Sequence, residues 1–352
     1  MGNTIKDVAK LAGVSISTTS LAINNQPGVK EETRLRVLDA VKKLNYHPNR
    51  IAQGLVKNKT NNIDVIVSGP KYGYFSSPIL FEVIKGIAEV INANGYHLVL
   101  KVTTAEEEVG FIEEQINNRG CDGMIFWGTR MSEENFADLC QSPLPVVAVA
   151  RYLKNKPFFS VTVDDLKGGY LGTKHLLEMG HRRIGFIGNL HGISSAEDRF
   201  CGFKKALQEY GVDIDRNLVI SADFYQESGY TAMREILPWH ERGLSAVFAA
   251  SDLMALGAIK AIIEAGLKVP DDISVVGFDN MPNADLLVVP LTTITSPIHK
   301  LGETAAVKLL KLLRKEQVEY HTKLDVDLVV RSSTSIPGRS RQLPEHEAQH
   351  RR

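Results

Sequence analysis

Long apolar runs are missing from this sequence of 352 residues, because no stretch approaches the roughly 18 consecutive apolar residues that span a bilayer. The first residues, Met-Gly-Asn-Thr-Ile-Lys-Asp, lack the apolar centre of a signal peptide. Myristoylation would call for Ser or Thr at position 6, which is Lys. We therefore expect a cytoplasmic protein without a membrane span.

Cysteine is scarce, and its distribution argues against two kinds of site. Cys121, Cys140 and Cys201 are odd in number and far apart, without the paired spacing of a disulfide framework or a cysteine zinc site. Gly185, Gly188 and Gly192 do not form a GxGxxG loop, and no GxSxG elbow is present. A dinucleotide-dependent dehydrogenase is thereby disfavoured, and we expect no catalytic residue, metal or cofactor.

The formal net charge of the whole chain is zero, but the charges are unevenly distributed along it. The chain has 41 Lys/Arg and 41 Asp/Glu, but residues 1–60 hold ten basic and four acidic residues, and residues 61–352 hold 31 and 37. A basic head on an acidic body is the asymmetry expected when one end of a chain meets phosphate groups.

The basic segment has the pattern of a helix-turn-helix. Thr4 and Asp7 predict a capping box at the start of a first helix, Gly13 allows a tight turn, and Ser15 caps a second helix. Apolar residues at helical spacing predict the buried faces, which are Ile5, Val8, Ala9 and Ala12 in the first helix and Ala22 and Ile23 in the second. The outward positions of the second helix are Ile16, Ser17, Ser20 and Leu21.

A third helix is expected from about Glu31 to Leu44, with four residues facing the same core: Leu35, Leu38, Val41 and Leu44. Two short amphipathic helices joined through a glycine are common, so the pattern alone is equally compatible with a head that does not bind DNA. The third helix and the basic charge favour DNA binding.

Several ordered stretches resemble the LacI/GalR family of bacterial transcriptional repressors. They are IKDVAKLAGVS, RLRVLDAVKKLNYHPNRIAQGL, GGYLGTKHLLEMGHRRIGFIG, ASDLMALGAIKAI, VPDDISVVGFDN and LTTITSPIHKLGETAAVKLL. The resemblance runs from Thr4 to about Ser335. It implies a helix-turn-helix head, a hinge helix and a two-lobed effector-binding body.

From Asn62 onward, short apolar runs alternate with amphipathic helical stretches. This alternation predicts an α/β body with parallel sheets, and its two sets predict two similar lobes. The pattern does not show how often the chain passes between the lobes. The resemblance implies three crossings, near residues 160, 291 and 322, as in periplasmic sugar-binding proteins.

The expected organisation has four parts. Residues 1–46 form the all-α helix-turn-helix domain, 47–61 the hinge helix and linker, 62–337 the periplasmic-binding-protein-like effector-binding and dimerisation domain, and 338–352 a disordered tail. Lobe 1 takes about 62–159 and 292–322, and lobe 2 takes about 160–291 and 323–337. The tail has no leucine heptad, whereas tetrameric relatives carry a leucine-rich helix there, so we expect a homodimer.

DNA contacts follow from the positions of the resembled family. Ile16, Ser17 and Leu21 should reach base edges, and the apolar Ile16 and Leu21 favour thymine methyl groups over guanine. The remaining positions on this helix are expected at phosphates: Thr18, Ser20 and Asn24.

The hinge is expected to contribute DNA contacts as well. Leu55 matches the family residue that enters the minor groove, and Asn49 and Arg50 lie on the same short segment. Gly54 weakens a free hinge helix. A plain linker with Leu55 packed on the body is the alternative.

A ligand cleft is expected between the lobes, at the carboxyl ends of strands. By resemblance, Arg199 and Asp279 match the ligand-binding arginine and carboxylate, and Phe224 matches the aromatic that packs on a bound ring. Ser251 holds a polar contact position, and Asp252 follows it. An ion pair between Arg199 and Asp279 is the alternative for these two residues.

The first lobe is expected to border the same cleft with Tyr74, Phe75, Ser77, Ile79 and Trp127, although core packing explains any one of them equally well. Ala150 departs from the family, whose members often have Asp there. Because Arg151 follows, the ligand is expected to be smaller, differently hydroxylated or negatively charged.

These observations predict a dimeric, ligand-responsive repressor that binds palindromic operator DNA. The effector is expected to be a sugar or a sugar derivative, and the target genes to serve carbohydrate uptake or catabolism. The alternatives are an exported sugar-binding protein, which would lack the basic head, and a nucleobase-responsive regulator. Salt-dependent binding to a palindromic duplex separates a regulator from an exported protein.

Overall fold

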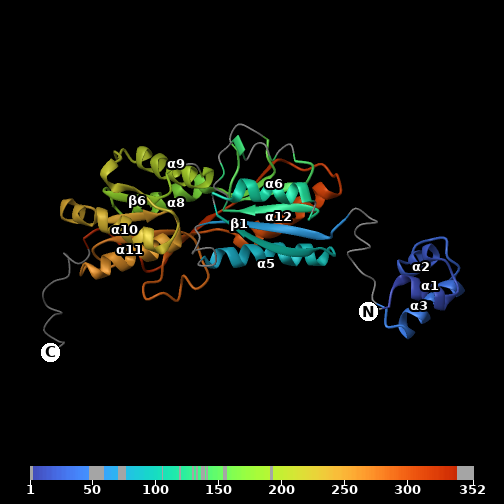
Figure 1. Cartoon of the computed structure of the whole chain (residues 1–352). Helices are drawn as coiled ribbons and strands as arrows, with labels where there is room; N and C mark the ends of the chain where they lie inside the picture. The colour runs from blue at the N-terminus through green and yellow to red at the C-terminus, as the bar shows by residue number, and fades with distance from the viewer. Residues whose placement is uncertain are drawn as a thin grey trace, which may run out of the picture. The chain divides into compact units, whose positions relative to one another are not determined.

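The computed structural model describes residues 3–46, 59–69 and 77–338, except for short gaps at 105, 119, 129–130, 132–133, 136–138, 140–141, 154–156 and 191–192. The chain divides into two compact units, Met1–Thr60 and Asn61–Arg352 (Figure 1). None of the described helices combines the length and the apolar character that a membrane crossing requires.

The described residues of the first unit form three helices, α1 (Ile5–Ala12), α2 (Ile16–Ile23) and α3 (Glu31–Lys43). The predicted caps are confirmed. The Thr4 amide and hydroxyl both donate to the Asp7 carboxylate, and the Thr18 amide donates to Ser15 Oγ at 3.0 Å. Gly13 has φ +63° and so makes the tight turn that a side chain would strain.

The core of this unit corrects the prediction for α3. Val37 and Ala40 are buried, whereas Leu35 and Leu38 are exposed, and only Val41 and Leu44 of the predicted four pack against the core. Residues spaced by three drift about 60° per step around a helix of 3.6 residues per turn, so Leu35 lies opposite Leu44. The buried face follows the spacing 37, 40, 41 and 44.

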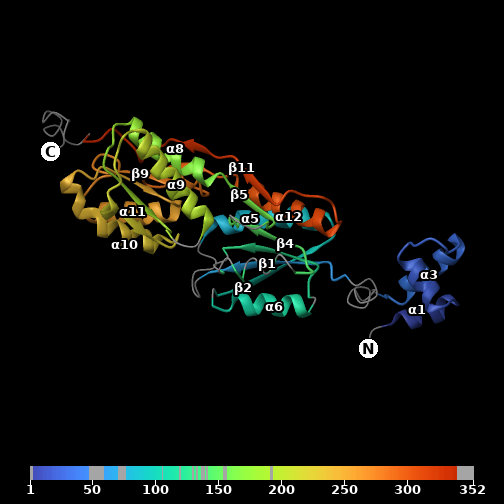
Figure 2. The same ribbon diagram turned by 90° about the horizontal axis from the view of Figure 1, so that it is seen from above.

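The second unit is built from two α/β lobes, each with a six-stranded sheet in the described residues. The sheet of the first lobe has the order β11-β5-β4-β3-β1-β2. Its strands are β1 (Asn62–Ser68), β2 (His97–Thr103), β3 (Gly123–Trp127), β4 (Val146–Val149), β5 (Ser160–Val163) and β11 (His321–Leu324). Helices α5 (Pro78–Ala93) and α12 (Ile298–Leu313) cover one face and α6 (Glu108–Asn118) covers the other (Figure 2).

The sheet of the second lobe has the order β12-β10-β9-β8-β6-β7. Its strands are β6 (Ile184–Gly188), β7 (Val219–Ser221), β8 (Ala246–Ala249), β9 (Ser274–Asp279), β10 (Thr292–Thr295) and β12 (Asp327–Val329). Helices α8 (Asp165–Glu178) and α9 (Ser194–Glu209) lie on one face, and α10 (Gln226–Ile236) and α11 (Asp252–Glu264) on the other (Figure 2). Short 3-10 turns, η2 (Arg216–Leu218) and η3 (Leu237–Arg242), complete this lobe.

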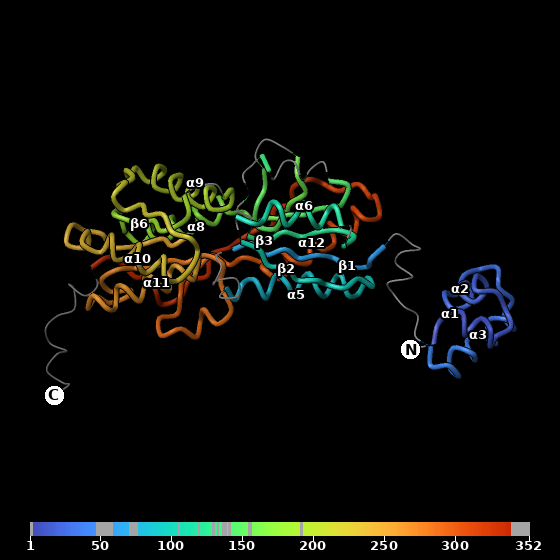
Figure 3. Tube along the Cα trace, in the orientation of Figure 1, coloured from blue at the N-terminus to red at the C-terminus, as the bar shows by residue number. Residues whose placement is uncertain are grey.

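The strand pairing agrees with the predicted parallel sheets, except that β12 pairs antiparallel with β10. β5 and β11 belong to the first sheet and β10 and β12 to the second, so the chain crosses between the lobes after Val163, Thr295 and Leu324 (Figure 3). The crossings therefore lie a few residues later than those predicted near 160, 291 and 322. Each one follows the end of a strand, whereas the predicted boundaries fell at strand starts.

A close contact between α8 and α9 sets the geometry of the second lobe. A Cβ atom on Gly169 would lie 2.1 Å from the carbonyl oxygen of Arg199, and one on Gly202 would lie 2.1 Å from that of Leu166. Only glycine allows the two backbones to approach so closely. The contact fixes α9 against α8, and α9 carries Arg199 toward the space between the lobes.

Candidate functional site

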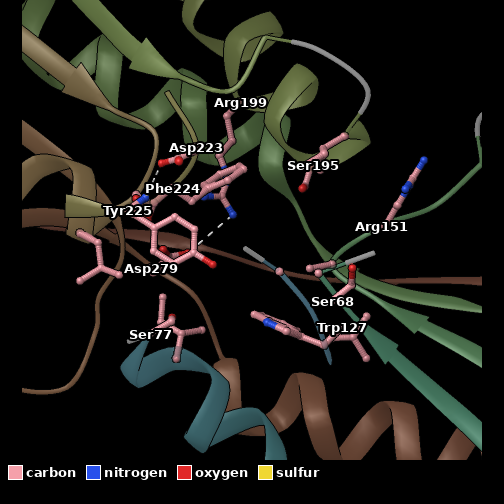
Figure 4. A pocket seen from close by; sticks show the side chains of 18 residues that line it. Ser68, Ser77, Trp127, Arg151, Ser195, Arg199, Asp223, Phe224, Tyr225 and Asp279 are labelled. Atoms are coloured by element: carbon pink, nitrogen blue, oxygen red, sulfur yellow. Dashed lines mark hydrogen bonds and ion pairs between the residues drawn. The ribbon is translucent and has the colours of Figure 1, made fainter. Parts of the chain in front are cut away.

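A cavity of about 170 Å³ lies between the two lobes of the second unit (Figure 4). Its walls come largely from the carboxyl ends of strands, where parallel α/β sheets bind their ligands. The first lobe lines it with Ser68, Gly69, Ser77, Ile79, Trp127, Gly128, Val149, Ala150 and Arg151. The second lobe lines it with Ile193, Ser195, Arg199, Asp223, Phe224, Tyr225, Ser251, Leu253 and Asp279.

The structure brings most of the predicted effector residues together in this cavity. Those that line it are Ser77, Ile79, Trp127, Arg199, Phe224, Ser251 and Asp279. Phe75 and Tyr74 lie outside the described residues.

Asp252 does not line the cavity, in contrast to the prediction. It is fully buried, and its carboxylate accepts a hydrogen bond from the Met281 amide at 2.7 Å and another from the Thr293 hydroxyl at 2.6 Å. At the first position of α11 the side chain turns back beneath the strand ends, so it supports the loop after β9 rather than a ligand.

Arg199 is the centre of the charged side of the cleft. Its Nε donates to Asp165 at 2.8 Å and its Nη1 donates to the carbonyl oxygen of Ala250 at 2.5 Å, while Nη2 lies 3.6 Å from Asp279. The guanidinium also stacks on the Phe278 ring, 3.6 Å from its centroid. All of these partners belong to the second lobe, so the ion pair with Asp279 forms one wall and does not bridge the cleft.

Burial changes the acid–base properties of this wall. Desolvation raises the pKa of Asp279 to about 8 and that of Asp165 to about 6, and the nearby Arg199 opposes both shifts. Desolvation likewise raises the pKa of Asp252 to about 7. Near neutral pH, Asp279 is therefore largely a protonated carboxyl that can both donate and accept hydrogen bonds.

Three residues of the cleft have a backbone conformation that side chains normally avoid. Ala150, Phe224 and Asp279 have φ values of +61°, +73° and +111°. Among the described residues, the other non-glycine positions with positive φ are five asparagines, which tolerate it, and Lys315. Strain held in this way concentrates at binding sites and marks the cleft as functional independently of any resemblance.

Aromatic and hydroxyl groups complete the walls. Trp127 and Ser77 come from the first lobe and face Phe224 and Tyr225 of the second (Figure 4). Ser77 precedes α5 without making a capping bond. Ser251 caps α11 by accepting from the Met254 amide at 3.2 Å, and its Oγ lies 3.5 Å from the Phe224 carbonyl. Ser251 therefore supports the Phe224 loop.

Arg151 lines the cleft but is turned away from its aromatic side chains (Figure 4). It is 4% exposed, and its Nη2 donates to the Met131 carbonyl at 2.7 Å. Ala150, beside it, leaves room where a longer side chain would stand. The position of Arg151 does not support the expected preference for a negatively charged ligand.

In the first unit, α2 presents the side chains that were predicted to contact DNA. Ile16 and Leu21 are 46% and 38% exposed and Ser17 is exposed, whereas Thr19 is buried. Thr18 lies 2.8 Å from Ser15 Oγ, and the Asn24 amide donates to the Ser20 carbonyl at 2.8 Å. Two large apolar side chains thus remain at the surface of a short helix. The predicted hinge contacts Asn49, Arg50 and Leu55 lie outside the described residues.

Two family models match the chain. Residues 4–49 match the model described as "Bacterial regulatory proteins, lacI family", and residues 173–334 match "Periplasmic binding protein-like domain". The regulator MalR of Clostridium butyricum is 36% identical over 94% of this chain and 98% of its own length. The chain belongs to the lacI family. It is a ligand-responsive, DNA-binding transcriptional regulator and not an enzyme.

Solved structures of lacI-family regulators share this fold. The lac repressor dimer bound to operator and an anti-inducer has a TM-score of 0.84, with 29% identity over 95% of this chain and 100% of that chain. The CelR–cellobiose complex has a TM-score of 0.73, with 30% identity over 94% and 99% of the two chains. A repressor named PurR from Mannheimia succiniciproducens is 36% identical over 94% of this chain and 98% of its own.

One group of metal-ligating side chains lies outside the cleft of this lacI-family chain. Glu89 of α5 is 3.1 Å from His299 Nε2, and Glu303 of α12 is 3.7 Å from Nδ1 of the same ring. Lys300 pairs with Glu303 at 2.8 Å, so ion pairs within the group account for it. His346 and His350 have HExxH spacing, but they lie outside the described residues and we assign no site there.

The sequence prediction missed Asp165 and Asp223, and the signal for both was present. Each follows a strand directly or nearly so, Asp165 after β5 and Asp223 after β7. The rule that ligands bind at the carboxyl ends of parallel strands marks these positions, as it marks Ser68 at the end of β1. Only the structure adds that Asp165 is the main partner of Arg199.

Proposed function

We propose that this lacI-family regulator represses its target genes by binding a palindromic operator as a homodimer, and that a neutral, sugar-like molecule in the cleft changes that binding. The observation that carries the ligand class is the charge balance around Arg199. Its guanidinium is already compensated by the buried Asp165 carboxylate, and Arg151 is directed to the Met131 carbonyl. A ligand phosphate would therefore meet more carboxylate than free cation.

The remaining wall chemistry supports a sugar. Hydroxyl groups of Ser68, Ser77 and Ser195 and a largely protonated Asp279 suit adjacent ligand hydroxyls, which need donors as well as acceptors. Trp127 and Phe224 suit the apolar face of a ring. Related structures are described with cellobiose and, for an Enterococcus faecium regulator, with ribose. We extend this to carbohydrate uptake or catabolism as the regulated process, acting in the cytoplasm.

The test is a thermal-shift screen of the full chain followed by calorimetry. The panel contains ribose, cellobiose, maltose, ribose 5-phosphate and the nucleobases hypoxanthine and guanine. A neutral sugar that raises the melting temperature and loses its effect in Trp127→Ala, but not in Trp239→Ala, supports the proposal. Selective binding of the phosphate or of a nucleobase would overturn it. The nucleobase arm tests the alternative of a nucleobase-responsive regulator.

The DNA side of the proposal rests on the apolar surface of α2. Ile16 and Leu21 favour A·T pairs at the bases they face, through thymine methyl groups. A binding-site selection with the full chain should return such pairs, and a fixed G·C pair there contradicts the assignment. Leu21→Gln should change base preference, whereas Thr18→Ala should weaken all sequences by a similar factor.

The dimer contact is proposed at the loop between β9 and β10. Leu286 and Val288 are 76% and 99% exposed, and such large apolar side chains are costly to leave in water. Leu286→Lys with Val288→Lys should shift the chain to monomers in analytical ultracentrifugation. Ile214→Lys, at an apolar residue that is 37% exposed on the same lobe, should not.

A further inference from the structure

Tyr152 joins the two lobes next to the cleft. It follows Ala150 and Arg151, which line the cavity on the first lobe. Its phenol donates to Asp198 Oδ2 at 2.8 Å, and its backbone amide donates to Ser194 Oγ at 3.0 Å. Ser194 and Asp198 belong to α9 of the second lobe. One residue of the first lobe is therefore bonded twice to one helix of the second.

The Tyr152 ring is held from the first lobe. It stacks on His321 with the ring centroids 4.6 Å apart and an angle of 15° between the ring planes. His321 Nε2 in turn lies 2.8 Å from the Thr162 hydroxyl, which joins β11 to β5. The side chain is half-buried, so its phenol is not free to swing to another partner. A displacement of α9 must therefore stretch the bond to Asp198.

Each end of this contact lies beside a wall of the cleft. On α9, Ser194 and Asp198 bond to Tyr152, while their neighbours Ser195 and Arg199 line the cavity. On the first lobe, Tyr152 directly follows Arg151 of the cavity wall. Tyr152 and Asp198 do not themselves line the cavity. A change in the separation of the walls must therefore change the geometry of this pair.

We propose that the Tyr152–Asp198 hydrogen bond is a positioning contact that sets the separation of the lobes and thereby the coupling between cleft and operator binding. It acts through the cleft walls and touches neither ligand nor DNA. The inference rests on the proposed operator response of the chain. Since coupling between two sites is a free energy shared by both, loosening this contact must alter operator affinity even without effector.

The experiment compares single-atom deletions in the full chain. Tyr152→Phe removes the phenol oxygen but keeps the ring stacked on His321. Tyr230→Phe is the matched control, because the Tyr230 phenol donates to Glu264 at 2.7 Å entirely within the second lobe. Operator affinity is measured without effector at fixed salt, on the duplex that the wild type selects. Amide hydrogen exchange is followed at residues 151–153 and in the first turn of α9.

Tyr152→Phe should change the operator Kd by about three- to tenfold, the net value of one ordinary hydrogen bond, and should speed exchange in both segments. Tyr230→Phe should change neither. In a double-mutant cycle, Asp198→Ala should add little to Tyr152→Phe, and Asp198→Asn, which keeps an acceptor oxygen, should be milder than Asp198→Ala.

Two results would overturn the inference. Wild-type exchange in Tyr152→Phe means that the bond does not hold the lobes, and faster exchange with an unchanged operator Kd means that it holds them without coupling. If the wild type selects no duplex at all, the proposed function fails instead, and the exchange data still report whether the contact exists.

Discussion

The second lobe contributes Arg199, Asp223 and Asp279 to the cleft, whereas the first lobe contributes Ser68, Ser77 and Trp127, and its Arg151 is turned away. Two of the three strained backbone positions, Phe224 and Asp279, also lie on the second lobe. The charged wall is held by buried ion pairs and a glycine-mediated helix contact. We propose from this difference that the second lobe orients the ligand and the first lobe covers it.

Removal of the charge at the centre of the second wall is the strongest test of this asymmetry. Arg199→Met leaves Asp165 and Asp279 buried without their cation, and we expect the free energy of unfolding to fall by about 3–5 kcal/mol. Urea denaturation measures it. Arg183→Met breaks a partly exposed pair with Asp215 and should cost at most about 1 kcal/mol. Equal losses of unfolding free energy in the two variants would mean that the Arg199 ion pairs stabilise the second lobe no more than an exposed pair does.

A glycine substitution tests whether helix packing holds that wall. Gly169→Ala places a methyl group against the Arg199 carbonyl and should lower the free energy of unfolding by about 1–3 kcal/mol. Gly110→Ala on α6 of the first lobe meets no atom within 4 Å and should stabilise by about 0.5–1 kcal/mol. Chemical denaturation of both variants decides the point, and a stabilising Gly169→Ala would contradict the close approach.

A pH series tests the buried carboxyl. Because the pKa of Asp279 in the folded chain is raised to about 8, the folded state binds a proton that the unfolded state has released, and stability falls as pH rises toward 8. Asp165, with a pKa of about 6, has largely finished titrating by pH 7, whereas Asp252, with a pKa of about 7, still titrates there and adds a smaller decrease. Between pH 7 and 8 the free energy of unfolding should fall by about 1 kcal/mol.

The control for the pH series is Asp279→Asn, because the Asn side chain has nearly the same shape as Asp and does not titrate. The free energy of unfolding of this variant should fall clearly less than that of the wild type over that unit of pH, because, of Asp165 and Asp252, only Asp252 still titrates there. A slope equal to that of the wild type would assign the effect to another group.

The first wall should contribute less to stability than the second wall. Trp127→Ala should change the free energy of unfolding by less than Arg199→Met, because the ring is only half-buried. It should weaken binding of the best sugar in the screen about tenfold, through loss of ring stacking and burial. Calorimetry measures the affinity. Unchanged affinity in Trp127→Ala would mean that the first lobe does not cover the ligand.

Hydrophobic periodicity predicted the strands and helices of the two lobes well, because a strand appears as a short apolar run and a helix as a longer amphipathic stretch. The predicted alternation of short apolar runs with helical stretches from Asn62 onward is the order in which the strands and helices of the two lobes occur. Periodicity failed in α3, because four residues spaced by three, which were predicted to face one core, do not lie on one face of the helix. Leu35 and Leu38 are exposed because that spacing drifts around the helix.

The sequence predicted those cleft residues whose role follows from their position along a strand or a helix. Arg199 and Asp279 line the cavity as predicted, whereas Asp252 does not, although it also lies at the end of a strand. Its orientation depends on Met281 and Thr293, which are distant in sequence. The partner of Tyr152 was beyond prediction for the same reason, because it lies on the other lobe.

The glycine contacts between helices recur throughout the body. Gly86 and Gly302 join α5 to α12, Gly169 and Gly202 join α8 to α9, and Gly229 and Gly257 join α10 to α11. Substitution at these positions requires two backbones to move, while most cleft residues stand at the ends of strands or in the loops that follow them. Outside the buried ion pairs of Arg199, mutation of cleft residues can thus exchange one effector for another without disturbing the scaffold, and gene duplication can yield regulators that differ in ligand but keep the same body.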